Sequence, residues 1–191
     1  MELFLNKYRI DSIRLKGWNY SWPAYYFVTI CIEDRGQYFG QIKNDEMHFS
    51  DLGYIAYKYW LEIKEHFPQT TLDEHIIMSN HVHGIVGVNI EKYKNDDEIF
   101  VETQNFASLQ KFINYKNKFG PQSKNLSSII RGYKTGVKNY ATINNKTFYW
   151  QARFYDHIIR NKYELNKIRQ YIIDNPKNWK YSKTNLLSLW M

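Results

Sequence analysis

The sequence contains little cysteine and no long hydrophobic run. Cys31 is the only cysteine among 191 residues, so an internal disulfide is excluded, and its place in the apolar run 25–32 predicts a buried, inert thiol. No run approaches the roughly 18 apolar residues of a membrane span. The N-terminal MELFLNKYRI lacks the charged-then-apolar order of a signal peptide. These absences predict a cytoplasmic protein that does not enter a membrane.

Acidic residues are fewer than basic ones. The chain has 19 Asp and Glu against 26 Lys and Arg, a formal net charge of +7. This sign suits a partner rich in phosphate, although many basic proteins bind no nucleic acid. Aromatic residues make up 18%. This surplus either offers stacking surface for bases or reflects an A/T-rich genome, whose codons favour Tyr, Phe, Asn, Lys and Ile.

The length suits one domain covering residues 1–191. Residues 1–24 alternate basic and aromatic side chains without a clean period, which predicts an irregular N-terminal arm with a short strand. Residues 89–125 are polar and also lack a sustained period. Because long irregular connections are usually mobile or functional, we expect this insertion to be partly disordered.

Between these segments, the pattern of apolar residues predicts an alternation of strands and helices. A helix is expected to begin at the N-cap Ser50 and to end at Pro68. The full expected order is a strand at 25–32, a hairpin at 41–49 turning at 44–45, a helix at 51–67, two strands within 72–88, a helix from 126 to 140, a strand at 150–160 and a helix at 163–174. This order predicts an α+β fold: a ferredoxin-like split βαβ antiparallel sheet with helices and an added C-terminal helix.

Two histidines flank one valine in the second strand of the 72–88 pair. Successive side chains of a strand point to opposite faces, so His81 and His83 share one face. Imidazole is the commonest metal ligand in proteins, but a histidine is more often a hydrogen-bonded structural residue. The pair therefore indicates a metal site only if further ligands come from elsewhere in the chain.

The last helix carries a phenol and an amide on one face. Tyr171 and Asn175 stand four residues apart, so they lie one turn from each other. A helix packed against the sheet could bring the amide oxygen to a metal and the hydroxyl beside it. Tyrosine, with a pKa near 10, is a weak nucleophile at neutral pH, so attack on phosphorus would need a metal that polarises the phosphate.

Four motifs in order resemble those of the HUH single-tyrosine transposases, and most closely the REP-associated tyrosine transposase branch. They are MSNHVHGIV, SSIIRGYKTGV, WQARFYDHIIRN and YIIDNP. The resemblance runs from about residue 25 to about residue 179. It implies the HUH endonuclease fold, in which the added C-terminal helix is the catalytic helix.

The resemblance also implies a site and a reaction. His81 and His83 would be metal ligands, Asn175 the third protein ligand and Tyr171 the nucleophile. The cofactor would be Mg²⁺ or Mn²⁺, and the partner single-stranded or hairpin DNA. Tyrosine attack would leave a 5′-phosphotyrosine link and a free 3′-hydroxyl, and a 3′-hydroxyl from another strand could reverse the step. The implied activity is therefore that of a DNA endonuclease and strand transferase.

Further residues are candidates of lower rank. Tyr163 and Tyr155 are rivals of the nucleophile, and His157 could be a general acid for the 3′-oxygen or a structural histidine. The basic side chains of the 126–140 helix are either a DNA-binding stripe or an ordinary solvated face. The candidate DNA contacts are Arg131, Lys134, Lys138, Trp150, Gln151, Arg153 and Arg160.

Two other functions are compatible with these motifs. One is a domesticated, sequence-specific DNA-binding protein that keeps the fold and no longer cuts. The other is an HUH replication initiator or relaxase, a class whose chains generally carry further domains. The sequence predicts either a monomer or a homodimer.

Overall fold

The computed structural model describes residues 14–15, 17–91, 93, 95–100, 104 and 124–179, together with two short paired strands of the N-terminal arm. Those strands are β1 (Leu3–Phe4) and β2 (Lys7–Tyr8). They agree with the strand expected in the arm. The rest of the arm up to residue 13 lies outside the described residues. Most of the polar insertion does too, so the disorder expected there stays a prediction.

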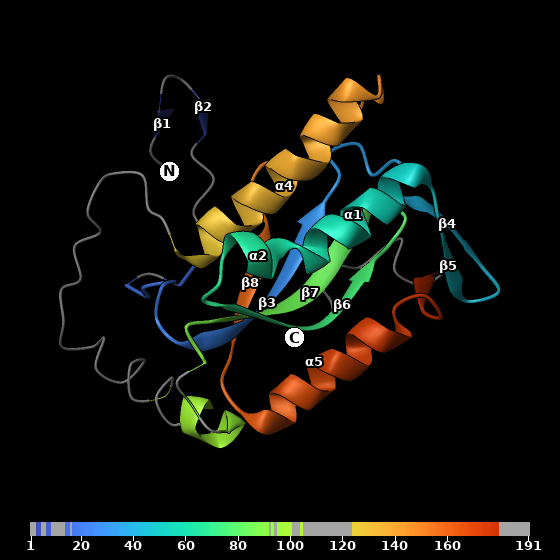
Figure 1. Cartoon of the computed structure of the whole chain (residues 1–191). Coiled ribbons are helices and arrows are strands. Elements are labelled where there is room, and N and C mark those ends of the chain that lie inside the picture. The colour runs from blue at the N-terminus through green and yellow to red at the C-terminus, as the bar shows by residue number, and fades with distance from the viewer. Residues whose placement is uncertain are drawn as a thin grey trace.

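The central sheet has four antiparallel strands in the order β6-β7-β3-β8 (Figure 1). These strands are β3 (Ala24–Cys31), β6 (Thr70–Ile77), β7 (His81–Val88) and β8 (Tyr155–Ile159). The helices that connect or follow them are α1 (Asp51–Leu61), α2 (Ile63–His66), α4 (Leu126–Ile143) and α5 (Lys162–Asp174). With α1 and α2 after β3 and α4 after β7, this is the split βαβ arrangement. The predicted α+β, ferredoxin-like fold is confirmed.

The sheet is buried on both faces, by different helices (Figure 1). Alternate residues of β3 divide between two apolar cores, because successive side chains of a strand point to opposite faces. Tyr26 and Val28 pack with α1 and α4, whereas Tyr25 and Phe27 pack with α5. The extra C-terminal helix therefore has one face of the sheet largely to itself.

The helices begin at capping residues that the sequence makes recognisable. The Ser50 side chain accepts a hydrogen bond from the backbone N–H of Gly53, as expected for the start of α1. Asn125 forms a capping box with Ser128 at the start of α4, and Asn161 caps α5. These caps fix where each helix starts and so which residues face the sheet.

Gly84, in the middle of β7, allows a close approach between α1 and the sheet. A Cβ built at this position would lie 2.2 Å from Cζ2 of Trp60, a side chain that is fully buried. The indole of α1 thus packs directly against the backbone between His83 and Ile85. Any larger residue at position 84 would push α1 or β7 away.

A small antiparallel hairpin, β4 (Gly40–Lys43) and β5 (Glu46–Phe49), precedes α1. Its turn residues Asn44 and Asp45 have φ angles of 52° and 62°. Two successive positive φ angles are those of a type I′ turn, which Asn and Asp tolerate. The predicted hairpin and its turn are confirmed.

Two element predictions need correction. The strand expected at 150–160 covers only Tyr155–Ile159, because the chain before it is held by other contacts: Trp150 makes an isolated bridge to Ile32, and Arg153 has a φ of 68°. The single helix expected up to Pro68 is divided at Glu62 into α1 and α2. Within the described part of the chain, no helix has the length and apolar character that crossing a membrane would require.

Candidate active site

His81 and His83 lie side by side on the face of β7 that α5 covers. Their partners in β3 are Cys31 and Thr29. The imidazole centroids are 4.5 Å apart, and the residues are only 3% and 1% exposed. The arrangement expected from the spacing is present, and both rings are shielded from bulk water.

Hydrogen bonds orient both imidazoles, and for His81 they indicate which ring nitrogen carries the proton. Nδ1 of His81 lies 2.7 Å from Oδ1 of Asn80, an oxygen that can only accept, so this nitrogen is the donor. Nδ1 of His83 lies 2.9 Å from Oγ1 of Thr29. In both rings Nδ1 is engaged by a neighbouring side chain and Nε2 is the nitrogen nearer α5, the arrangement in which metal-binding histidines are usually held.

Helix α5 brings Tyr171 and Asn175 to the same place. The Tyr171 hydroxyl lies within hydrogen-bond distance of Nε2 of His83, at 3.2 Å. Asn175 is the C-cap of α5, has helical dihedral angles and is 3% exposed. The spacing of four residues therefore places the phenol and the amide together, as the sequence indicated.

Two polar atoms of this cluster are buried without a hydrogen-bond partner among the described residues. They are Nε2 of His81 and Oδ1 of Asn175. Leaving such an atom unpaired costs about 1–3 kcal/mol, and these two differ from the other unpaired buried atoms of the described chain in lying together on the histidine pair. Two neutral imidazole nitrogens and an amide oxygen fit a divalent cation. The described residues hold no group of three or more His, Cys, Asp and Glu suited to a metal, and the role of Asn175 as third protein ligand stays a prediction.

Burial sets the protonation of the site. It lowers the pKa of His81 to about 4, although nearby Asn175 opposes the shift, and it lowers the pKa of His83 well below its ordinary value. Burial also raises the pKa of Tyr171, which the Asn175 amide partly offsets. Near pH 7 the imidazoles are therefore neutral and able to bind a metal, while the phenol keeps its proton.

We predict that the metal-free protein loses stability as the pH falls from 6.5 towards 4. Unfolded His81 takes up a proton near 6.5, whereas folded His81 stays neutral down to about 4. The unfolded state binds more protons in this window, so the free energy of unfolding should fall by roughly 3 kcal/mol from His81 alone. His83 acts in the same direction. Urea unfolding at several pH values should show a smaller fall for His81→Gln than for the wild type, and equal falls would contradict this assignment.

Aromatic rings surround the cluster. The Phe27 ring stacks on that of His83, with ring centroids 5.3 Å apart, and meets the Tyr171 ring edge-on, with centroids 6.0 Å apart. Trp179 stacks on His81 with ring centroids 6.0 Å apart. The sequence analysis gave no role to Trp179, Thr29 or Asn80. Thr29 had a detectable signal, since it is the one hydroxyl in an otherwise apolar stretch of β3 apart from the tyrosines.

Other candidate residues lie outside this cluster. Nε2 of His157 is 2.6 Å from Oε1 of Glu164 in the first turn of α5, whereas Tyr171 lies about two turns further along that helix. Tyr163 is 78% exposed, and Tyr155 is half-buried against Phe27. Of the three tyrosines, Tyr171 is the one placed on the histidine pair. The acid role of His157 stays a prediction.

The basic side chains of α4 hold the segment before β8. Nζ of Lys134 lies 2.7 Å from the carbonyl oxygen of Gln151 and 2.9 Å from that of Arg153. Nζ of Lys138 donates to the carbonyl of Phe148, and Nε1 of the half-buried Trp150 donates to the carbonyl of Lys134. These contacts explain why residues 150–154 do not extend β8.

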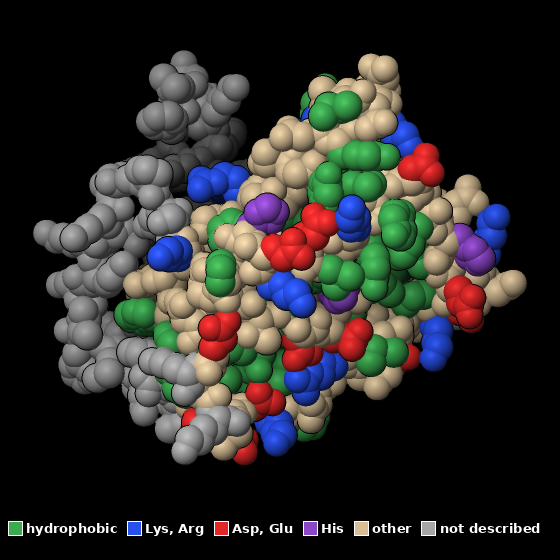
Figure 2. All heavy atoms as spheres, viewed as in Figure 1, with side chains coloured by type: hydrophobic (Ala, Val, Ile, Leu, Met, Phe, Trp, Pro, Cys, Tyr) green, Lys and Arg blue, Asp and Glu red, His purple; other side chains and the backbone are tan. Residues whose placement is uncertain are grey.

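The side chains of the other DNA-binding candidates reach the surface. Arg131, Gln151, Arg153 and Arg160 are exposed. Figure 2 shows that on the face formed by α1 and α2, acidic and basic side chains are interspersed and hydrophobic ones gather over α1. The positive charge of the chain is therefore not concentrated on that face, and DNA contact by these residues stays a prediction.

Comparison with known proteins gives one sequence relative and a related fold. No family model matches the chain. An uncharacterised protein of Haemophilus influenzae is 37% identical over 169 residues, which cover 88% of each protein. A solved structure of a REP-associated tyrosine transposase bound to a REP hairpin is similar with a TM-score of 0.53 and 16% identity, covering 92% of this chain and 76% of that one. The chain therefore belongs to the family of the Haemophilus influenzae protein and has a fold like that of the REP-associated tyrosine transposase.

Proposed function

We propose that this protein is a transposase-type DNA strand transferase that nicks single-stranded, hairpin-flanked DNA through Tyr171 and then rejoins it. The observation that carries the proposal is the 3.2 Å contact between the Tyr171 hydroxyl and Nε2 of His83. Beside it lie Nε2 of His81 and Oδ1 of Asn175, which are buried and lack hydrogen-bond partners among the described residues. A structure that shares the fold was solved on a REP hairpin, which supports hairpin DNA as the substrate class.

His81, His83 and Asn175 would hold Mg²⁺ or Mn²⁺. When bound, such a cation polarises a phosphate and offsets the charge that develops on it. The three side chains are uncharged ligands, so none of them would repel the negatively charged phosphate of DNA. Their burial also excludes water from competing for the same positions.

Tyr171 would supply the attacking oxygen. Its oxygen forms a bond to phosphorus, the bond from phosphorus to the 3′-oxygen breaks, and that oxygen leaves as a 3′-hydroxyl; the phenol loses one proton and the leaving oxygen gains one. The phosphotyrosine bond keeps the energy of the phosphodiester, so rejoining needs no ATP. Since the Tyr171 hydroxyl and Nε2 of His83 are hydrogen-bonded in this structure, that contact would break before the phenol attacks.

The four proposed site residues meet within one copy of the chain, so the proposed site needs no residue from a second copy. Phe27 and Trp179 line the same site and hold the imidazoles by ring stacking. The proposed reaction therefore depends on how α5 sits on the sheet, since α5 carries both the nucleophile and the third ligand.

The test is adduct formation by the wild-type protein with a fluorescently labelled hairpin oligonucleotide that has single-stranded flanks. We expect a protein–DNA adduct that survives SDS, forms with Mg²⁺ or Mn²⁺, disappears with EDTA and returns when Mn²⁺ is added in excess. Hairpin binding without any adduct under these conditions would overturn the proposal and favour a DNA-binding protein that does not cut.

A further inference from the structure

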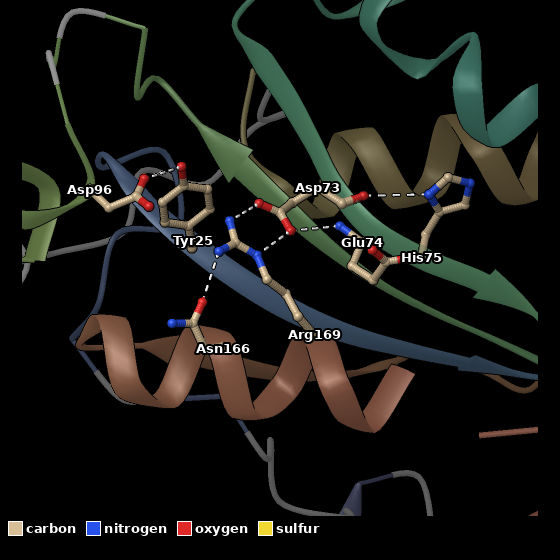
Figure 3. Close-up of polar contacts among 7 residues, drawn as sticks. All are labelled: Tyr25, Asp73, Glu74, His75, Asp96, Asn166 and Arg169. Atoms are coloured by element: carbon tan, nitrogen blue, oxygen red, sulfur yellow. Dashed lines mark hydrogen bonds and ion pairs between the residues drawn. The ribbon is translucent and has the colours of Figure 1, made fainter. Parts of the chain in front are cut away.

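An irregularity in β6 places a carboxylate against α5. The register between β6 and β7 shifts between Leu72 and His75, where three steps along β6 match two along β7. Asp73 and Glu74 therefore lie opposite one residue, as in a β-bulge. The bulge leaves His75 on the α1 side, stacked on Trp60, while Asp73 reaches towards α5 (Figure 3).

Asp73 and Arg169 form a two-point ion pair between β6 and α5. Nε of Arg169 donates to Oδ1 of Asp73 at 2.8 Å, and Nη2 donates to Oδ2. The remaining guanidinium nitrogen, Nη1, donates to Oδ1 of Asn166 at 3.0 Å, so the planar group is held at three points (Figure 3). A guanidinium bound through two parallel hydrogen bonds has a fixed orientation as well as a fixed distance.

The carboxylate is held from the sheet side as well. The backbone N–H of Glu74 donates to Oδ1 of Asp73 at 2.7 Å. Burial alone would raise the pKa of Asp73, but the hydrogen bonds from Arg169 and from the Glu74 N–H keep it below its ordinary value. Asp73 is thus ionised at neutral pH, and the bulge determines its direction.

The beginning of the polar insertion lies beside this pair. Asp96 accepts a hydrogen bond of 2.8 Å from the Tyr25 hydroxyl (Figure 3). In the helical turn at 96–100, Ile99 and Phe100 are buried in the apolar core between the sheet and α5. The negative charge of Asp96 also acts on Arg169. The guanidinium is therefore flanked by acidic groups from two separate segments.

We propose that the Asp73–Arg169 pair positions Tyr171 and Asn175; this inference rests on the proposed function. Arg169 precedes Tyr171 by two residues. Leu165, Ile168 and Ile172 make the apolar contacts of α5 with the sheet. The polar contacts besides the ion pair are that of Glu164 with His157 in the first turn and that of Tyr171 itself with His83. Apolar contacts are non-directional, so they hold the helix on the sheet but tolerate small sliding or rotation. The two-point ion pair restrains both in the half of α5 that carries Tyr171, whereas the contact of Glu164 with His157 acts at the first turn.

The expected consequence is on rate more than on folding. The Asp73 and Arg169 side chains are 16% and 32% exposed, and partly exposed ion pairs contribute little to stability. A misplacement of about 1 Å at a reacting group can reduce a rate by about 100-fold. Loss of the pair should therefore slow Tyr171 without unfolding the protein.

The experiment compares Arg169→Lys and Asp73→Asn with Lys167→Met, which removes an exposed charge from the same helix. Lysine at position 169 keeps the charge but cannot make the two-point contact. We expect adduct formation to slow by about 10- to 100-fold in the first two variants, with hairpin affinity changed less than about threefold, and no slowing in Lys167→Met. A wild-type rate of adduct formation in Arg169→Lys would overturn the inference. So would a slowing that disappears at lower temperature, because it would then come from partial unfolding of the variant and not from misplacement of Tyr171.

A second measurement needs neither DNA nor metal. The ¹⁵N resonances of the His83 imidazole report the hydrogen bond from Tyr171 in the metal-free protein. Arg169→Lys and Asp73→Asn should shift them in the direction that Tyr171→Phe does, and Lys167→Met should not. If the wild-type protein forms no adduct, the proposed function is wrong, but the His83 resonances still test whether the ion pair positions Tyr171. Unchanged His83 resonances in Arg169→Lys would overturn the positioning role alone.

Discussion

Tyr171→Phe is expected to abolish the covalent protein–DNA adduct while preserving the fold and the binding of hairpin DNA. Removing a nucleophile lowers a rate by several orders of magnitude, here at least about 10⁴-fold. The substitution removes the hydrogen bond to Nε2 of His83 and the interaction with the Asn175 amide, so stability should fall by about 1 kcal/mol. The measurement is SDS gel electrophoresis of a labelled oligonucleotide after incubation with Mn²⁺, with binding followed by fluorescence anisotropy.

The matched control is Tyr163→Phe, which removes a hydroxyl from the same helix at a residue 78% exposed. It should form the adduct at the wild-type rate. An adduct that persists in Tyr171→Phe would transfer the nucleophile to another tyrosine, and Tyr155, half-buried beside Phe27, would be tested first.

His81→Ala is expected to reduce affinity for Mn²⁺ by at least about 100-fold, since even the hydrogen-bond partners of metal ligands are worth 10- to 100-fold. Nε2 of His81 is buried and has no hydrogen-bond partner among the residues that the structure describes, and the Asn175 side chain, the other proposed ligand, lies near it. Titration calorimetry with Mn²⁺ in the absence of DNA measures this directly. Adduct formation at low Mn²⁺ should fall in parallel and recover partly at high Mn²⁺.

His48→Ala provides the control, because His48 is an exposed histidine on the β4-β5 hairpin. It should leave both affinity and adduct formation unchanged. Equal Mn²⁺ affinity in His81→Ala and the wild type would remove His81 from the proposed ligands, and an adduct that resists EDTA in both would remove the metal from the proposal.

The sequence predicted the fold and the faces of the site residues well, because both follow from local periodicity. The alternation along β7 places His81 and His83 on one face, and the helical repeat places Tyr171 and Asn175 on one face. The 3.2 Å distance between His83 and Tyr171 could not be predicted. It depends on how α5 packs on the sheet, which periodicity does not encode.

The missed features depend on contacts between distant segments. The bulge that directs Asp73 towards Arg169 is a mismatch in strand register, and those two residues are 96 positions apart. The lysines of α4 have the spacing of an exposed basic stripe, yet Lys134 and Lys138 donate to backbone carbonyls. A charge pattern indicates which face of a helix is polar, but not whether the charged atoms meet solvent, DNA or another part of the chain.

At the proposed site, the hydrogen bond between Tyr171 and His83 would couple the binding of metal and DNA. Nε2 of His83 contacts the phenol in the metal-free state and would bind the cation in the loaded state. Breaking this bond costs about 1 kcal/mol, which reduces the intrinsic metal affinity about fivefold. A DNA phosphate that accepts a hydrogen bond from the released phenol would offset this cost. By reciprocity, DNA and metal should then each tighten the binding of the other, and the nucleophile stays restrained until both are present.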